Sequence, residues 1–112
     1  MDARVEALRS ELAAWAQKRP GMRRLWVYGS RAQGTHRGDS DLDIAFEIDL
    51  LSDSVAAREF QERTLPTWRL ELSELSGLPV HPEPSVGRAS NVAQYVAQSG
   101  VLVYDREWPD PA

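Results

Sequence analysis

The chain has 112 residues, of which 42% are hydrophobic and 27% charged, and its formal net charge is -4. These values predict one folded domain and argue against tight binding of nucleic acid through a broad basic face. The sequence has no cysteine, which excludes disulfide bonds and thiolate metal sites, and it has no apolar run of the roughly 20 residues that a membrane span needs, so we expect a cytoplasmic protein.

The first half of the chain is predicted to contain a helix followed by two strands. Apolar residues spaced three and four apart predict an amphipathic helix over residues 5–15, closed by the turn signal Pro20-Gly21. The apolar run over residues 25–28 predicts a buried strand that enters a tight turn at Gly29. Apolar and polar residues alternate over residues 41–50, which predicts a strand with one apolar and one acidic face.

The second half is predicted to contain two helices and two short strands. Ser52 or Ser54 caps a helix that runs to residue 76, in which Pro66 either starts the second half or causes a kink. Residues 78–83 predict a short edge strand weakened by prolines, residues 90–98 a helix, and residues 101–105 a final strand. The apolar stripe of the long helix consists of Phe60, Leu65, Trp68, Leu72 and Leu75.

The order of these elements predicts an α+β fold of mixed α/β character, in which helices pack mainly on one face of a short mixed sheet. We expect residues 1–106 to form a single domain. Residues 107–112 contain two prolines and are expected to form a flexible tail.

Two groups of residues at and after the turn at Gly29 have both a structural and a chemical interpretation. Gly29-Ser30 is either an ordinary turn or a phosphate site, in which backbone amides and the Ser30 hydroxyl bind the anion. Asp41 and Asp43 leave one strand face with α-carbons about 6.6 Å apart, so they either hold Mg²⁺ or form the solvent-facing side of the sheet. Glu47 shares that face about 13 Å from the pair, and we expect it to be solvated.

The combination of the two groups is more specific than either group alone. Gly29-Ser30 is followed by ten residues and then by Asp41-Leu42-Asp43, within the segment YGSRAQGTHRGDSDLDI. This spacing and context resemble the nucleotidyltransferase superfamily of the DNA polymerase beta type, in particular its minimal form, the MNT domain. The final helix followed by GVLVYD also resembles the family, which implies a small nucleotidyltransferase fold over the whole chain.

The resemblance implies a Mg²⁺-dependent enzyme that transfers a nucleotide, with AMP from ATP as the best concrete candidate, to a hydroxyl group. Asp41 and Asp43 would be catalytic and would hold two Mg²⁺ ions. Gly29 and Ser30 would bind the nucleotide triphosphate. Arg31 either reaches a phosphate or is a surface arginine.

The chain departs from the family pattern at a third carboxylate, which members usually carry on a later strand. The corresponding residue is His81, which could accept a proton from the incoming hydroxyl but is a poor Mg²⁺ ligand. Glu83 would share a face with His81 if the strand continues past Pro82, and it is the alternative catalytic residue. The departure makes an impaired catalytic site one of the expectations.

Three functions follow from the resemblance. The first is an active protein adenylyltransferase, the antitoxin of a pair with a HEPN-type ribonuclease toxin, in which some members modify a toxin tyrosine. The second is an impaired antitoxin that neutralises its partner by binding. Exposure of Trp68 and Trp108 would favour it, whereas the commoner fate of such residues is the core of the domain. The third is a nucleotide or metal sensor. The small domain leaves little room for an acceptor-binding module, which favours a protein acceptor, and its acidic charge argues against direct binding of RNA.

Overall fold

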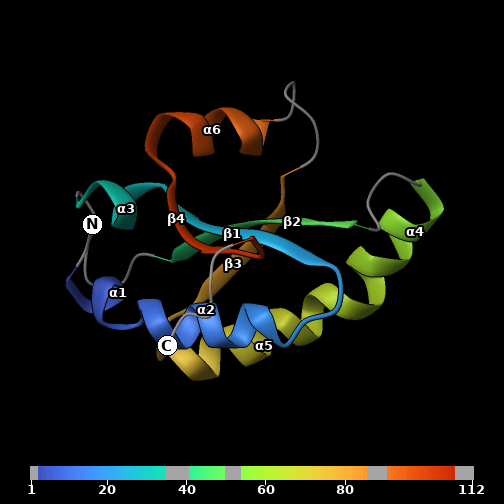
Figure 1. Cartoon of the computed structure of the whole chain (residues 1–112), viewed down its shortest axis with the longest axis horizontal. Coiled ribbons are helices and arrows are strands. Elements are labelled where there is room, and N and C mark those ends of the chain that lie inside the picture. Colours follow the sequence, from blue (N-terminus) through green and yellow to red (C-terminus); the bar gives the residue numbers. More distant parts are fainter. Residues whose placement is uncertain (1–2, 35–40, 50–53, 86–90, 108–112) are drawn as a thin grey trace.

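The computed structural model describes residues 3–34, 41–49, 54–85 and 91–107, and Figure 1 shows their arrangement. The predicted helices and strands occur in the predicted order, and a short helix, α3, lies between the first two strands. The elements are α1 (Ala3–Ala7), α2 (Arg9–Gln17), β1 (Met22–Tyr28), α3 (Ser30–Gln33), β2 (Leu42–Ile48), α4 (Ser54–Glu59), a π-helical turn (Phe60–Thr64), α5 (Leu65–Ser76), β3 (Val80–Pro84), α6 (Asn91–Ser99) and β4 (Val101–Asp105). No helix within these ranges is long and apolar enough to cross a membrane. The expected tail lies outside them, apart from Glu107.

The described strands form one mixed sheet in the order β3-β2-β1-β4. β1 pairs antiparallel with β2 and with β4, whereas β2 pairs parallel with β3. β3 lies at an edge of the sheet, as predicted, and pairs with β2 on one side. Pro82 and Pro84 have no N–H group that could donate a hydrogen bond to a further strand on the other side. The α+β fold with a short mixed sheet is therefore confirmed.

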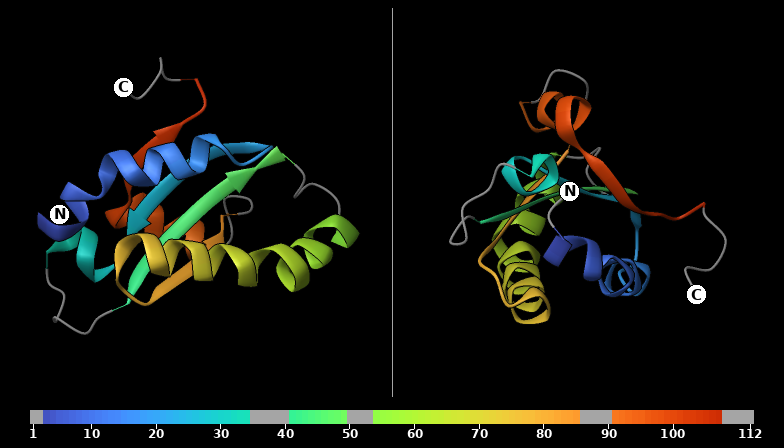
Figure 2. Two further views of the ribbon diagram at one scale, coloured as in Figure 1. Left: turned by 90° about the horizontal axis from the view of Figure 1, so that it is seen from below. Right: turned by 90° about the vertical axis from the view of Figure 1, so that its left-hand side faces the viewer.

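Helices cover the two faces of the sheet unequally (Figures 1 and 2). α2 and α5 lie along one face, and their ring pair Trp15 and Trp68 meets edge to face with centroids 5.2 Å apart. α6 lies over the opposite face and contacts β1. The acidic side chains of β2 point to this second face, so the candidate site lies on the same side of the sheet as α6.

The hydrophobic core lies between the sheet and the pair α2 and α5. Alternate residues of β2 point into it, as the sequence predicts, and Leu42, Ile44 and Phe46 are at most 1% exposed. The Phe46 ring meets the Trp68 ring at a centroid distance of 5.3 Å. The predicted stripe of the long helix is confirmed: Trp68 and Leu72 are buried, and its other three members pack against the core.

The long helix from residue 54 to residue 76 changes its winding in the middle. Pro66 lies in the first turn of α5, directly after the π-helical turn. Because proline has no N–H and its ring clashes with the carbonyl four residues earlier, regular α-helical bonding cannot continue through this point. The helix accommodates Pro66 with a wider turn, so this residue starts the second half of the helix, as one of the two predicted alternatives.

Two element boundaries differ from the predictions. The helix predicted over residues 5–15 is divided at Leu8, whose N–H donates to the Val5 carbonyl at 3.0 Å, a spacing of three residues that tightens the turn. β1 begins at Met22 rather than at residue 25. Met22 is 2% exposed, but the two arginines that follow it interrupt the apolar run in the sequence.

Candidate active site

The turn after β1 brings the backbone of Gly29 against the Asp43 carboxylate. Gly29 has a φ angle of +76°, and a β-carbon at this position would lie only 2.5 Å from Asp43 Oδ2. α3 begins at the next residue, Ser30, and the Gln33 N–H closes the turn on the Gly29 carbonyl at 3.1 Å. Glycine is therefore required here twice, for its backbone angle and for its missing side chain.

The two candidate metal ligands lie at the start of β2. Asp43 pairs with Tyr28 of β1 and is half-buried, whereas Asp41 lies just before the strand and is exposed. Burial raises the pKa of the Asp43 carboxyl; the nearby His81 lowers it in part, and the negative charge of Asp41 raises it. The structure thus places Asp43 against the Gly29 turn and Asp41 close enough to Asp43 for their charges to interact. The role of the two aspartates as metal ligands stays a prediction.

His81 of β3 lies directly beside Asp43 in the parallel pairing of β3 and β2. β3 continues past Pro82, so Glu83 shares a face with His81, and Glu83 Oε1 lies 2.8 Å from His81 Nε2. Arg69 Nη2 lies 3.4 Å from the other ring nitrogen, His81 Nδ1. The strand position beside the aspartate pair therefore carries a histidine, and the nearest carboxylate on this strand is bonded to that histidine.

The candidate site does not contain a complete metal centre of side chains. Within the ranges that the structure describes, no three carboxylate or histidine groups converge in a way that could hold a metal ion. A pair of carboxylates is nevertheless sufficient for Mg²⁺ when waters and substrate phosphates supply the remaining oxygens. The residues present thus fit an ion that binds together with a nucleotide.

The structure gives a different outcome for each of the sequence predictions on Arg31, Trp68 and Trp108. Arg31 is only 2% exposed, so the prediction of a surface arginine is wrong, and a role at the phosphates stays a prediction. Trp68 is 7% exposed and belongs to the core, so it offers no apolar surface to a partner. Trp108 lies outside the described residues.

Three residues of this site were not singled out by sequence reasoning. Tyr28 is buried next to Asp43; its burial raises its pKa to about 12, and the negative charges of Asp43 and Glu83 add to the rise. The Gly29 N–H donates to Ser99 Oγ at 3.2 Å, and Ser99 Oγ donates to the Tyr95 carbonyl at 3.2 Å. The only sequence signal was the spacing of Tyr95 and Ser99, which puts them on one helix face but does not say what that face meets.

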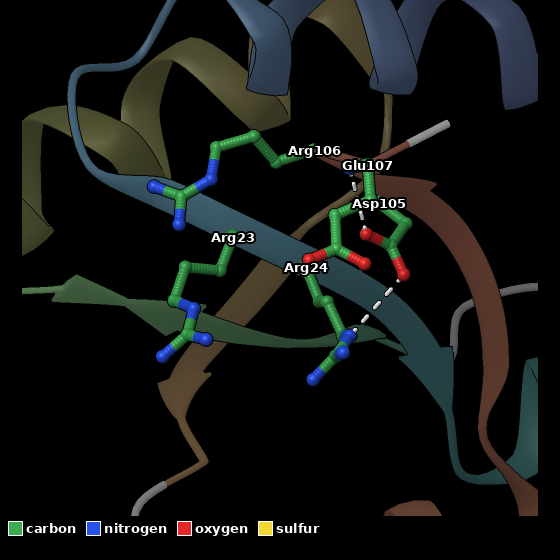
Figure 3. A pocket seen from close by; sticks show the side chains of 5 residues that line it. All are labelled: Arg23, Arg24, Asp105, Arg106 and Glu107. Atoms are coloured by element: carbon green, nitrogen blue, oxygen red, sulfur yellow. Dashed lines mark hydrogen bonds and ion pairs between the residues drawn. The ribbon is translucent and has the colours of Figure 1, made fainter. Parts of the chain in front are cut away.

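A second cluster of charged residues lies at the opposite end of β1 (Figure 3). Arg24 Nε lies 3.2 Å from Asp105 Oδ2, and Figure 3 shows these side chains next to the Glu107 backbone. The Glu107 N–H and the Arg24 guanidinium lower the pKa of the Asp105 carboxyl. The space between the lining residues is about 10 Å³, which is room for one water molecule. We therefore interpret this cluster as a clamp between β1 and β4 and not as a ligand site.

Comparison with known families identifies one match. The model of the family described as polymerase beta, nucleotidyltransferase, matches residues 10–107, a range that contains every candidate site residue. A comparison with curated proteins gives no match.

Three solved structures resemble the chain over most of its length. A toxin-antitoxin structure with AMP-PNP has a TM-score of 0.59 and 22% identity, and the match covers 88% of this chain and 73% of the other. An MntA-HpeT toxin-antitoxin variant with two aspartate-to-glutamate substitutions has a TM-score of 0.56 and 20% identity, covering 93% and 74%. A tyrosine-to-alanine variant of the same pair has a TM-score of 0.53 and 23% identity, covering 92% and 70%. Identities this low establish the shared fold alone.

Proposed function

The chain belongs to the polymerase beta nucleotidyltransferase family, and from this we propose that it transfers a nucleotide, AMP from ATP, to a hydroxyl group of a partner protein. The observation that carries the proposal is the contact between the Gly29 turn and Asp43. A glycine turn that presents backbone to a phosphate lies against a carboxylate that can share a cation with that phosphate. This arrangement suits a nucleoside triphosphate bound together with Mg²⁺.

Asp41 and Asp43 are the residues that would hold Mg²⁺ in this proposal. The burial of Asp43 and the charge of Asp41 make the ionised pair unfavourable on its own, which a bound cation would relieve. Bound Mg²⁺ supplies neutralisation of the charge that develops on the phosphate oxygens during in-line displacement. Gly29 and Ser30 position the triphosphate, and Arg31 is a candidate for a further phosphate contact.

His81 Nδ1 is the proposed acceptor of the proton that the attacking hydroxyl loses, and the hydroxyl takes the place of the 3.4 Å contact with Arg69 Nη2. His81 lies beside Asp43 across the β2 and β3 pairing, and Glu83 holds its Nε2 at 2.8 Å. Glu83 acts as the positioning residue for the imidazole in this assignment. The hydroxyl oxygen forms a bond to the α-phosphorus of ATP while pyrophosphate leaves, so atoms and charge balance without a further reactant.

The proposed partner is a toxin protein, of the HEPN ribonuclease type that the sequence resemblance implies. The fold similarity to three toxin-antitoxin structures supports an antitoxin role.

A label-transfer experiment tests the proposal. The purified chain is incubated with Mg²⁺, α-labelled ATP and a candidate toxin from the neighbouring gene, and the label on that candidate is measured. We expect label with the wild type and none with the Asp41→Asn, Asp43→Asn variant. The matched control is Asp49→Asn, the same chemical change on an exposed aspartate beyond the far end of β2, which should retain transfer. Equal labelling by all three proteins would contradict the proposal.

The presence of His81 in place of a carboxylate favours a second candidate function, an antitoxin of this fold that neutralises the toxin by binding alone. In that case the Asp41→Asn, Asp43→Asn variant would still form the complex and still suppress toxicity. An active transferase predicts the opposite, a stable complex that no longer protects. Growth rescue by the double variant therefore separates the two functions.

A further inference from the structure

Helix α6 is attached by a specific polar contact to the turn at Gly29, the proposed phosphate site, which we call the phosphate turn. The Gly29 N–H donates to Ser99 Oγ at 3.2 Å, in the last residue of α6. Ser99 and Gly29 are 70 residues apart in the sequence, so the contact fixes the end of α6 over the turn. Any residue on the same face of α6 is therefore held at a defined position beside the turn.

Tyr95 is that residue. It lies four positions before Ser99, and its carbonyl accepts the hydrogen bond from Ser99 Oγ, so both residues lie on one face of the helix, one turn apart. Tyr95 thus lies on the face of α6 that carries Ser99 and meets the Gly29 turn.

The exposure of Tyr95 is unusual for a large side chain of this small domain. It is 55% exposed, and the other large apolar residues found exposed in the described ranges, Val55 and Leu70, belong to α4 and α5, away from α6. An exposed aromatic ring beside a phosphate turn is suited to stacking against a nucleobase, which presents a flat face whatever its sequence identity.

We propose that Tyr95 is the stacking surface for the base of the nucleotide whose phosphates bind at the Gly29 turn. This inference rests on the proposed function, since it assigns the base subsite of the same nucleotide. Stacking depends on ring area and not on hydrogen-bond pattern, so the site should prefer purine over pyrimidine triphosphates and should discriminate little between ATP and GTP.

Isothermal calorimetry with two probes, ATP and inorganic tripolyphosphate, each with Mg²⁺, separates base recognition from phosphate recognition. The proteins are the wild type, Tyr95→Ala, Tyr95→Phe and the control Leu70→Ala, which removes an exposed apolar side chain on α5. Tyr95→Ala should weaken ATP binding about tenfold and leave tripolyphosphate binding unchanged. Tyr95→Phe keeps the ring and should bind ATP like the wild type, as should Leu70→Ala.

The possible failures are distinguishable. If Tyr95→Ala binds ATP as tightly as the wild type, or weakens ATP and tripolyphosphate equally, the base subsite is wrong while the phosphate site stands. If the wild type binds neither probe, the proposed function falls and the base subsite falls with it. Circular dichroism of each variant shows that the fold is retained, which the exposed position of Tyr95 favours.

Discussion

Gly29 lies so close to Asp43 that a β-carbon on Gly29 would be 2.5 Å from Asp43 Oδ2. This contact joins the end of β1 to the start of β2, and it places the Asp43 carboxylate directly beside the backbone of the Gly29 turn. The following predictions depend on it or on the side chains around it.

Substitution Gly29→Ala should impair both stability and transfer. A residue with a side chain is strained by about 1–3 kcal/mol at the positive φ angle of Gly29. The added methyl group also displaces the Asp43 carboxylate, which should lower the transfer rate about 100-fold. Gly34→Ala is the matched control, because Gly34 has a φ angle of +79° and no atom within 4 Å of an added β-carbon. Urea unfolding should show a lower free energy of unfolding for both variants, whereas only Gly29→Ala should lose transfer activity. Equal transfer by the two variants would contradict the role of the contact between Gly29 and Asp43.

Substitution Asp43→Asn should stabilise the metal-free protein at neutral pH. The folded-state pKa of Asp43 is raised above its ordinary value of 3.8, so the folded protein holds this proton more tightly than the unfolded chain. The contribution of the protonated carboxyl to stability is complete below pH 3.8 and is lost as the pH rises through the folded-state pKa. Thermal unfolding should therefore show a higher midpoint for Asp43→Asn at pH 7 and a smaller difference near pH 4. A lower midpoint at pH 7 would contradict the assignment.

The Tyr28 hydroxyl should titrate well above the ordinary range of a tyrosine. Its pKa of about 12, against 10.0 in the unfolded chain, means that its contribution to stability is complete below pH 10 and is lost between pH 10 and 12. An ultraviolet titration of the folded protein should show one late ionisation that disappears in Tyr28→Phe. Tyr28→Phe should also resist alkaline unfolding better than the wild type, and an unchanged titration curve in this variant would refute the prediction.

His81 should matter for the transfer rate more than for nucleotide binding. Loss of a general base typically costs about 100-fold or more in rate, so His81→Ala should lower the transfer rate by at least that factor with little change in the Kd of ATP. His81→Asp introduces the carboxylate that the sequence resemblance implies at this position. It should recover transfer while lowering stability without Mg²⁺, because it adds a charge beside Asp43. Transfer by His81→Ala at the wild-type rate would exclude the histidine as proton acceptor.

Local patterns were sufficient to predict much of the fold. The alternation in β2 predicts its buried face correctly because side chains of a strand alternate with a fixed period of two. β4 has the predicted bounds, since Gly100 separates a helical pattern from a short apolar run. The placement of Gly29 beside Asp43 also follows from the motif, because its spacing is characteristic of one supersecondary arrangement.

Contacts between distant segments were not predictable from local patterns. Ser99 meets Gly29, and Arg24 meets Asp105, only because strand order and helix packing bring them together. The exposure of Tyr95 depends on how α6 is oriented over the sheet, which no local pattern predicts. The division of the first helix at Leu8 likewise leaves the apolar periodicity intact and so produces no signal in the sequence.

The measurement that tests the central claim most directly compares the fate of two labels in one reaction. The chain, Mg²⁺ and the proposed partner toxin are incubated in parallel with α-labelled ATP and with γ-labelled ATP, and the toxin is separated and counted. Nucleotidyl transfer predicts label on the toxin from α-labelled ATP alone, with γ-label recovered as pyrophosphate, and loss of both signals in the Asp41→Asn, Asp43→Asn variant. Label from γ-labelled ATP on the toxin, or no label from either with the complex intact, would contradict the account.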